Sequence, residues 1–440
     1  MLGGGFGGLH TARHLERTLR RDPTVEISLV CRDNFFLYTP MLHEIASCDI
    51  DITHIVSPIR TLLRRTQVFI GDVERIDLDA RRVRVSHGFE QHSHDLEYDH
   101  LVIALGSITN FYGLPGLEGH ALTMKTLGDA IHLRNRLIAM LEEADTECAA
   151  GDDGLLTIVV AGGGFAGVET LAAVNDFVRE AARFYPRIDS NRIRMVLVHS
   201  GEVILPELGE HLGRYAQAKL AARGLEIVTH TRVAAVASDR VELSNGQRVA
   251  ARLVIWTAGT SPNPLLHDLP CPLDHGRLVA DEMLRVKGFD EVWALGDCAV
   301  VPDRRTGKAH PPTAQHALRE AKTVARNIAA TLRGEALKPF DFRTIGQLAA
   351  IGRRTGVARI LGVNFSGFAA WWLWRTIYLA KLPRLDKKIR VAIDWTLDLL
   401  FAKDFVQFLT VRAPALSHEP PPGPLVAAHD AARAVAEGAR

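Results

Sequence analysis

Two glycine patterns in the chain match a loop that binds the pyrophosphate of a dinucleotide. They read "GGGFGG" and "GGGFAGVE", and their spaced glycines are Gly3, Gly5, Gly8, Gly162, Gly164 and Gly167. Glycines at this spacing turn the backbone tightly and let it approach a phosphate, while the helix that follows offers free N–H groups and its positive dipole end. The sequence therefore predicts two dinucleotide sites, about 160 residues apart.

A phosphate loop of this kind sits between a strand and a helix. The second loop has this context, with an apolar run at 155–161, a helical pattern up to 184 and another strand at 193–200. The first loop is followed by a helical pattern and by the strand 25–30, but only Met1 and Leu2 precede it. We therefore expect the natural chain to begin upstream of Met1. A chain without this strand is expected to bind its first nucleotide poorly.

Composition favours a globular protein and sets limits on other functions. The chain has 440 residues, 47% hydrophobic and 23% charged, with a net charge of +1, so it should hold about two to three domains and offers no case for nucleic-acid binding. The five scattered cysteines suit reduced thiols, and no spacing suggests a metal site. His87, His92 and His94 are read as a solvated loop rather than as metal ligands. No run of about 20 uncharged apolar residues predicts a spanning helix.

Further strands end in small residues, where a cofactor could lie across the strand end. One is "YDHLVIALGS" at 98–107, which ends beside Gly106, and another is "EVWALGDCAVVPD" at 291–303. In the latter, Asp297 could accept hydrogen bonds from a sugar-like polyol. The alternative is a turn residue after Gly296, which is the commoner role of such an aspartate.

Taken in order, "GGGFGG", "LGS", "GGGFAGVE" and "LGD" resemble flavoproteins with two dinucleotide-binding domains. The resemblance implies an α/β fold with two Rossmann-like domains, the first binding FAD and the second binding NAD(P)H. The FAD domain is then discontinuous. We expect its first part at 1–117, the NAD(P)H domain at 118–260, its second part at 261–335, a C-terminal module at 336–412 and a flexible tail at 413–440.

Three segments are more specific and resemble type II NADH:quinone dehydrogenases. They are "NFFLYTPMLHEIAS" at 34–47, "PPTAQHALREAK" at 311–322 and the stretch 342–383, which contains "SGFAAWW". The resemblance implies an enzyme that passes hydride from NADH to FAD and then two electrons to a membrane quinone, without pumping protons. Cys31 and Cys48 lie seventeen residues apart, which argues against the C-x4-C redox pair of disulfide reductases.

The sequence departs from the usual pattern at both ribose-binding positions. The acidic residue expected at the end of the second strand of each unit is Cys31 in the first and His199 in the second. Asp33 and Glu202 lie a few residues further on and are the candidates to substitute. Because carboxylates select against a 2′-phosphate, the use of NADPH stays open beside NADH.

The resemblance also points to two catalytic residues. A Glu at the position of Glu169 lies near the flavin and the nicotinamide in that family, where it could tune the flavin or relay a proton; the alternative is a partner for the helix dipole in the first turn. Gln315 could hydrogen-bond the quinone or the nicotinamide, or simply begin a helix.

The C-terminal part is rich in tryptophan and is predicted to lie on an anionic membrane surface. Trp371, Trp374, Tyr378 and Leu382 recur at helical spacing, and a basic cluster follows at Lys381, Arg384, Lys387, Lys388 and Arg390. In a second helix within 391–409, Ala392, Trp395, Leu399 and Ala402 form the apolar stripe, and Arg390, Asp394 and Asp398 form the polar one. We expect a peripheral enzyme on the cytoplasmic face of a bacterial inner membrane, with a homodimer left open. The alternative is a soluble flavoprotein that reduces oxygen or a carrier protein and uses these helices as a protein interface.

Overall fold

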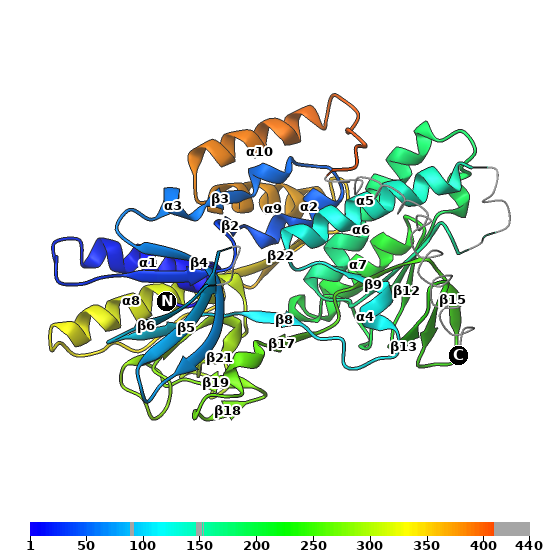
Figure 1. The fold of residues 1–440 in the computed structure, drawn as a ribbon. Coiled ribbons are helices and arrows are strands. Elements are labelled where there is room, and N and C mark those ends of the chain that lie inside the picture. Colours follow the sequence, from blue (N-terminus) through cyan, green and yellow to red (C-terminus); the bar gives the residue numbers. More distant parts are fainter. Residues whose placement is uncertain (89–91, 147–151, 153, 409–440) are drawn as a thin grey trace, which may run out of the picture. The chain divides into compact units, whose positions relative to one another are not determined.

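Two sheets carry the two glycine loops, and the strands next to each loop are parallel (Figure 1). The computed structural model describes residues 1–88, 92–146, 152 and 154–408. Met1–Phe405 pack as one unit, and all that follows concerns this unit. The predicted tail at 413–440, and the last residues of the predicted C-terminal module, lie outside the described residues.

The first sheet is built around Leu2, which fills the strand position ahead of the first loop. The N–H of Leu2 donates to the Val102 carbonyl at 2.8 Å, and its own carbonyl accepts from the N–H of Ala104 at 2.9 Å. On its other side, Leu2 forms a parallel bridge with Val30. Leu2 therefore anchors the loop between β1 (Ser28–Cys31) and β7 (Leu101–Ile103) through an isolated bridge to each strand.

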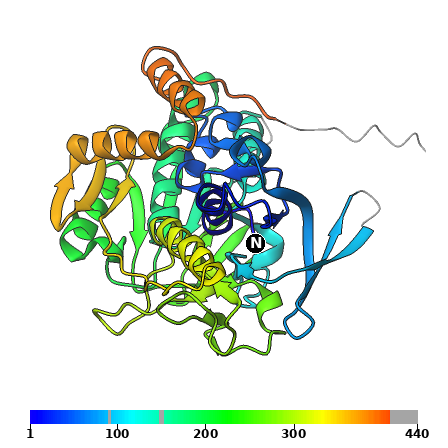
Figure 2. The same ribbon diagram turned by 90° about the vertical axis from the view of Figure 1, so that its left-hand side faces the viewer.

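The remaining strands and helices of this half surround that sheet. β1 pairs with β4 in parallel, β7 pairs with β20, and β5 and β6 extend β4 as an antiparallel hairpin. Helices α1 and α8 pack against each other beside it (Figure 2). The bounds are β2 Phe35–Leu37, β3 Val56–Pro58, β4 Gln67–Asp77, β5 Arg82–His87, β6 His92–Glu97, β18 Leu273–Asp274, β19 Arg277–Val279, β20 Val292–Ala294, β21 Ala299–Val300, α1 Phe6–Thr18, α2 Leu42–Ala46, α3 Ile59–Leu62 and α8 Ala314–Leu332.

The second sheet has the strand order β12-β11-β10-β16-β9, and all its neighbours are parallel. β10 and β16 are buried throughout, because α5 and α6 pack on one face of the sheet and β13, β14 and β15 pack on the other. The bounds are β9 Ala121–Thr123, β10 Thr157–Ala161, β11 Arg194–Val198, β12 Leu225–Val228, β13 Val233–Val236, β14 Arg240–Leu243, β15 Arg248–Ala250, β16 Leu253–Trp256, α4 Leu117–His120, α5 Leu127–Ala144, α6 Phe165–Ala181 and α7 Glu210–Ala221. β8 (Ser107–Thr109) and β17 (Thr260–Pro262) pair where the chain passes between the two sheets.

A third, antiparallel sheet and two helices complete the unit. The sheet consists of β22 (Gly346–Ala350), β23 (Gly356–Ile360) and β24 (Val363–Ser366), and β22 contacts α6. Helix α9 covers Gly367–Lys381 and ends before Pro383. Helix α10 covers Leu385–Leu397, so the helix predicted within 391–409 is wrong in its bounds.

The predicted orientation of both C-terminal helices is also wrong. Trp374, Leu382 and Trp395 are buried, because their aromatic and apolar side chains pack on the rest of the unit. Asp394 of the predicted polar stripe also faces the protein, where it pairs with His54. The exposed apolar side of α10 is instead formed by Leu385, Ile389, Ile393 and Leu397. Among the described residues, no helix is long and apolar enough to cross a membrane.

Candidate active site

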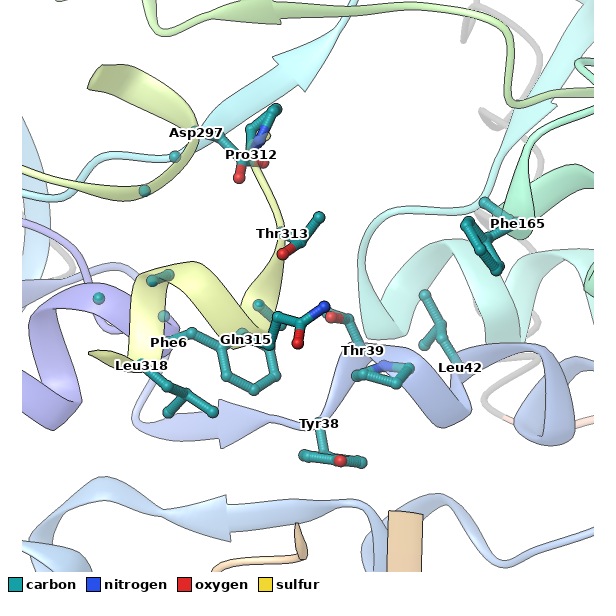
Figure 3. Close-up of a pocket in the computed structure, with 18 of the residues that line it drawn as sticks. Phe6, Tyr38, Thr39, Leu42, Phe165, Asp297, Pro312, Thr313, Gln315 and Leu318 are labelled. Atoms are coloured by element: carbon teal, nitrogen blue, oxygen red, sulfur yellow. The ribbon is translucent and has the colours of Figure 1, made fainter. Parts of the chain in front are cut away.

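A cavity of about 730 Å³ lies where the two glycine loops meet the C-terminal segments (Figure 3). Its walls include the first glycine loop, the strand end at Gly106, the turn at Asp297 and the first turns of α6 and α8. A second cavity of about 290 Å³ shares Gly5 and Gly106 with it and reaches Asp33. The structure therefore brings predicted site residues from distant parts of the sequence to two adjoining cavities. These residues are Gly5, Asp33, Gly106 and Asp297.

The first glycine loop has the geometry of a phosphate cradle. Gly3 has a φ of +109°, and a Cβ atom there would lie 2.2 Å from the Ala104 carbonyl oxygen. A Cβ on Gly8 would lie 2.0 Å from the carbonyl oxygen of Gly3, so this helix start can approach the loop only as glycine. A Cβ on Gly5 would meet no atom within 4 Å. The loop is therefore closed toward the sheet and open toward the cavity.

Asp297 is held by a short polar chain at the edge of the cavity. The Ser107 hydroxyl donates to its carboxylate at 2.8 Å, and the Lys125 ammonium donates to the Ser107 oxygen at 2.7 Å. Burial lowers the pKa of Lys125, and the nearby Asp297 charge opposes this shift. The arrangement fixes the Asp297 carboxylate at the edge of the cavity.

Glu169 lies in the wall between the two halves and is almost fully buried. Its Oε1 accepts from the Ala350 N–H at 3.0 Å and from the Trp374 indole N–H at 2.9 Å. Its Oε2 lies 3.9 Å from the His43 Nδ1. Burial raises the pKa of Glu169 to about 8, so its carboxyl group holds a proton at neutral pH. It is the fifth residue of α6, so the alternative of a dipole partner in the first helical turn is wrong.

Gln315 is the second residue of α8, and its side chain extends toward the middle of the cavity (Figure 3). Its amide nitrogen donates to the Gly346 carbonyl at 3.2 Å, which ties α8 to β22. Tyr378 and Lys381 of α9 line the same cavity. The C-terminal segments therefore build one wall of the site.

The second glycine loop repeats the close packing of the first. Gly162 has a φ of +115°, and a Cβ on Gly167 would lie 1.8 Å from the Gly162 carbonyl oxygen. A Cβ on Gly164 would meet no atom within 4 Å. Gly164 precedes α6, so the N-terminus of that helix is open to a phosphate group.

The ribose position beside this loop is occupied by His199. Its Nδ1 accepts from the Gly163 N–H at 3.2 Å, and its Nε2 lies 3.1 Å from the Val203 carbonyl oxygen. Burial lowers the pKa of His199, so the ring is neutral near pH 7. Glu202 is exposed and forms an ion pair with Arg214 at 2.5 Å. The structure therefore places His199 against the loop and leaves Glu202 on the surface.

Sequence reasoning missed several residues that the cavity brings together. Lys125 follows β9 and belongs to no motif, while Ser107 begins β8 and ends the quoted "LGS" but received no role. His43 lies within the quoted stretch 34–47 but received no role. Strand-end position was the available signal for Lys125. These residues line the same cavity as the predicted site residues Gly106, Glu169, Asp297 and Gln315.

Comparison with known proteins decides the family. Residues 1–321 match the family described as pyridine nucleotide-disulphide oxidoreductase, and residues 345–404 match the NDH2 C-terminal domain. The chain is 32% identical to the type II NADH:quinone oxidoreductase Ndh of Mycobacterium tuberculosis, over 91% of this chain and 87% of that one. The chain belongs to the type II NADH:quinone oxidoreductases.

Two further likenesses place this type II oxidoreductase among its relatives. It is 34% identical to the demethylphylloquinone reductase NdbB of Synechocystis, over 90% of this chain and 94% of that one. The structure of NDH2 from Plasmodium falciparum in complex with NADH covers 92% of this chain and 98% of its own, with a TM-score of 0.85 and 20% identity. The latter shows the shared fold. The predicted fold class is thereby confirmed, and FAD and NADH are the cofactors of the type II oxidoreductase.

Among the residues that the structure describes, no group of three or more histidine, cysteine or acidic side chains could hold a metal ion. His87 and His94, which were read as loop residues, belong to β5 and β6 and stack on each other with ring centres 4.5 Å apart. The loop reading is therefore wrong for these histidines. The β5–β6 hairpin holds these histidines at fixed positions along its two strands.

Proposed function

We propose that this type II oxidoreductase passes hydride from NADH to FAD and two electrons on to a membrane quinone, in the cavity beside Glu169 and Gln315, without pumping protons. The observation that carries the proposal is the contact of Glu169 with the C-terminal segments. One carboxyl oxygen accepts from Ala350 of β22 and from Trp374 of α9. The part of the chain that matches the NDH2 C-terminal domain therefore closes the site over a buried acid.

The two cofactors have separate residues to hold them. FAD would be held by Gly3, Gly5, Gly8, Asp33, Gly106 and Asp297, and NADH would be held by Gly162, Gly164, Gly167 and Glu202. The flavin supplies hydride acceptance and onward electron transfer. We retain the domain division predicted from the sequence, because the first and third segments share the FAD sheet and 118–260 contain the whole second sheet.

The protein supplies positioning and a proton to this chemistry. Phe6, Tyr38 and Tyr378 line the cavity with aromatic rings. Glu169 holds a proton at neutral pH and can pass it to a reduced acceptor. The Gln315 amide is fixed to β22 and can hydrogen-bond a quinone oxygen or the nicotinamide.

The membrane contact is made by the outer side of α10. Leu385, Ile389, Ile393 and Leu397 lie four residues apart and expose 72%, 52%, 51% and 46% of their surface. This spacing gives one continuous apolar face. Of the predicted basic cluster, Arg384, Lys387 and Lys388 hydrogen-bond to the protein, while Arg390 is exposed. The face suits a helix lying in the interface plane, on the cytoplasmic side of a bacterial inner membrane.

A triple serine variant at Leu385, Ile389 and Ile393 should lose binding to anionic vesicles. Each change removes on the order of 1 kcal/mol of apolar burial, so partitioning should fall by roughly 100-fold. Co-sedimentation of FAD-loaded protein measures this. The matched control is Leu332→Ser, which changes an exposed leucine at the end of α8 and should bind vesicles normally. Equal sedimentation of the triple variant and the wild type would place the membrane contact elsewhere.

His199→Glu should shift the enzyme toward NADH and away from NADPH. A glutamate there can still accept from the Gly163 N–H, and it adds a charge that binds the ribose hydroxyl and repels a 2′-phosphate. A charge-assisted hydrogen bond contributes about 1.5–3 kcal/mol, so the ratio of the two Michaelis constants should change by about 10–100-fold. Glu202→Gln should shift the ratio in the opposite direction. If neither variant changes the ratio, the ribose is bound by other residues.

The second candidate function is a soluble flavoprotein that docks a carrier protein or a second copy on the α10 face. The exposed apolar residues of α10 favour it, since such a face also suits a protein interface. NADH oxidation by full-length, FAD-loaded protein separates the two functions. A rate that rises with a short-chain quinone and with vesicles supports the quinone reductase. A rate that depends on oxygen alone, with no response to either addition, supports the alternative.

A further inference from the structure

A small polar cavity of about 60 Å³ lies behind Glu169, on the side away from the first glycine loop. Glu169 and His43 line both this cavity and the large one, so the Glu169 carboxyl group separates the two spaces. One side of the small cavity is deeply buried at Trp374, and another side includes Arg353, whose side chain is 52% exposed. The cavity therefore extends from the buried acid toward the surface. We call it the polar cavity.

Charged side chains of both signs line the polar cavity. The acidic ones are Glu44, Asp49, Glu169, Asp176, Glu180 and Asp398, and the basic ones are Arg353, Arg375 and Lys403. Lys403 pairs with Asp49 at 2.6 Å, and Arg353 lies 3.7 Å from Glu180. Burying charged groups lowers the stability of the folded protein, because their loss of hydration is repaid only in part by pairing. The cluster is therefore a candidate for a function. None of these groups except Glu169 has a role in the function proposed above.

Two polar atoms in this cavity lack a hydrogen-bond partner among the described residues. They are the Oδ1 of Asp398 and the Nε of Arg375. The Arg375 guanidinium lies between the Trp371 and Trp395 rings, 4.4 Å and 4.6 Å from their centres. A single water molecule needs about 10–15 Å³, so the polar cavity can hold a short chain of waters that satisfy these atoms. Waters and carboxylates in alternation form a path along which protons can move.

The reaction needs such a path because its protons do not balance without solvent. Reducing a quinone to a quinol takes two electrons and two protons. NADH releases two electrons and one proton as it becomes NAD⁺, so one further proton must come from bulk water. The large cavity is where the cofactors and the quinone would lie during turnover. A route through the polar cavity would bring this proton to Glu169 without crossing the bound substrates.

We propose that the polar cavity delivers the solvent proton to Glu169, with Asp398 and Glu44 as its relay groups. The proposal rests on the quinone reductase function proposed above. Asp398 is the residue that caps the C-terminus of α10, and its carboxylate is faced by Asp49, Glu180, Arg353, Arg375 and Lys403. Glu44 lies on α2 and accepts from the Trp395 indole N–H at 3.2 Å. The path would run from the surface at Arg353 past Asp398 and Glu44 to Glu169.

The protonation of these groups supports a relay. Burial raises the pKa of Asp398 and raises that of Glu44 well above its ordinary value. Both carboxyl groups can therefore take up and release a proton closer to neutral pH than an exposed acid can. His43 is less suited to this role, because burial lowers its pKa to about 4 and keeps the ring neutral.

The test compares Asp398→Asn with Asp394→Asn in FAD-loaded protein. Each change removes one acid, Asp394 within α10 or Asp398 at its C-terminal cap, but Asp394 pairs with His54 and does not line the polar cavity. In Asp398→Asn, the bound flavin should be reduced by NADH at the wild-type rate, and quinol formation should slow by about 10-fold. This loss of rate is smaller than the loss of about 10²-fold that is expected when Glu169, the direct proton donor, is replaced. The slowed step should show a larger solvent deuterium isotope effect, and Asp398→Glu should restore the rate.

A second readout does not depend on quinone at all. Infrared spectroscopy of the resting enzyme follows the replacement of the Glu169 carboxyl proton by deuterium, and Glu169→Gln identifies its band. Exchange should slow by about 10-fold in Asp398→Asn and stay unchanged in Asp394→Asn. If the enzyme proves not to reduce quinone but exchange still slows, the proposed function fails and the proton path stands. Unchanged exchange and an unchanged isotope effect in folded Asp398→Asn would overturn the proton path.

Discussion

Gly5→Leu is expected to give a folded protein that contains no flavin. Gly5 precedes α1 with a φ of −79°, which any residue adopts, and a Cβ there meets no protein atom within 4 Å. The leucine side chain would therefore enter the cavity at the helix N-terminus, where the FAD pyrophosphate needs the backbone N–H groups. The flavin absorbance of the purified protein measures the loss, and circular dichroism confirms the fold.

Gly164→Leu is the matched control for this change. Gly164 has the same place before α6, a φ of −78° and the same open surroundings. This variant should keep its flavin and raise the Michaelis constant for NADH by at least about 10-fold, since the lost contacts belong to the second loop. Loss of flavin in Gly164→Leu, with normal flavin in Gly5→Leu, would exchange the roles of the two loops.

The two nucleotide-binding units could be predicted because their signals are local. An apolar strand, a glycine loop and a helical pattern follow one another in the sequence, and the structure has β10, the loop and α6 in that order. The first unit shows the limit of this reasoning. Two residues, Met1 and Leu2, were too short to predict a strand. Leu2 nevertheless pairs on both sides, because it lies between β1 and β7 in the folded protein.

The orientation of α10 could not be predicted, because periodicity does not say which side faces the protein. The apolar stripe with Trp395 was expected to face the membrane. Trp395 is buried because its indole N–H finds the Glu44 carboxylate, and Asp394 faces inward because His54 pairs with it. Both partners are more than 300 residues away in the sequence. Only the fold brings them to the helix.

In the candidate site, too, residues within motifs could be predicted, whereas contacts that only the fold creates could not. Gly106, Asp297, Glu169 and Gln315 were found through motifs and resemblance, and all four line one cavity. Lys125 was missed, because its role depends on Ser107 and Asp297 coming together across the fold. The resemblance suggested that Glu169 could relay a proton, but its raised pKa could not be predicted, because burial by segments distant in the sequence causes it.

Glu169→Gln is expected to keep FAD and the fold but to slow turnover with quinone by about 10²-fold. Glutamine has the same shape and can still accept from Ala350 and Trp374, so the local contacts survive. It cannot release a proton. Wild-type turnover should fall as the pH rises through the Glu169 pKa of about 8, because the carboxyl group then loses the proton it supplies. The turnover of Glu169→Gln should not fall with pH in this way.

Stability provides an independent check on the same carboxyl group. Its pKa rises from an ordinary 4.5 to about 8 on folding, so folding favours the protonated form. The stabilisation is therefore complete below 4.5 and is lost progressively as the pH rises toward about 8. Glutamine does not ionise, so the melting temperature of the wild type should fall relative to that of Glu169→Gln across this range. Parallel melting curves with pH, together with unchanged turnover, would mean that Glu169 is ionised in the folded protein and does not donate the proton.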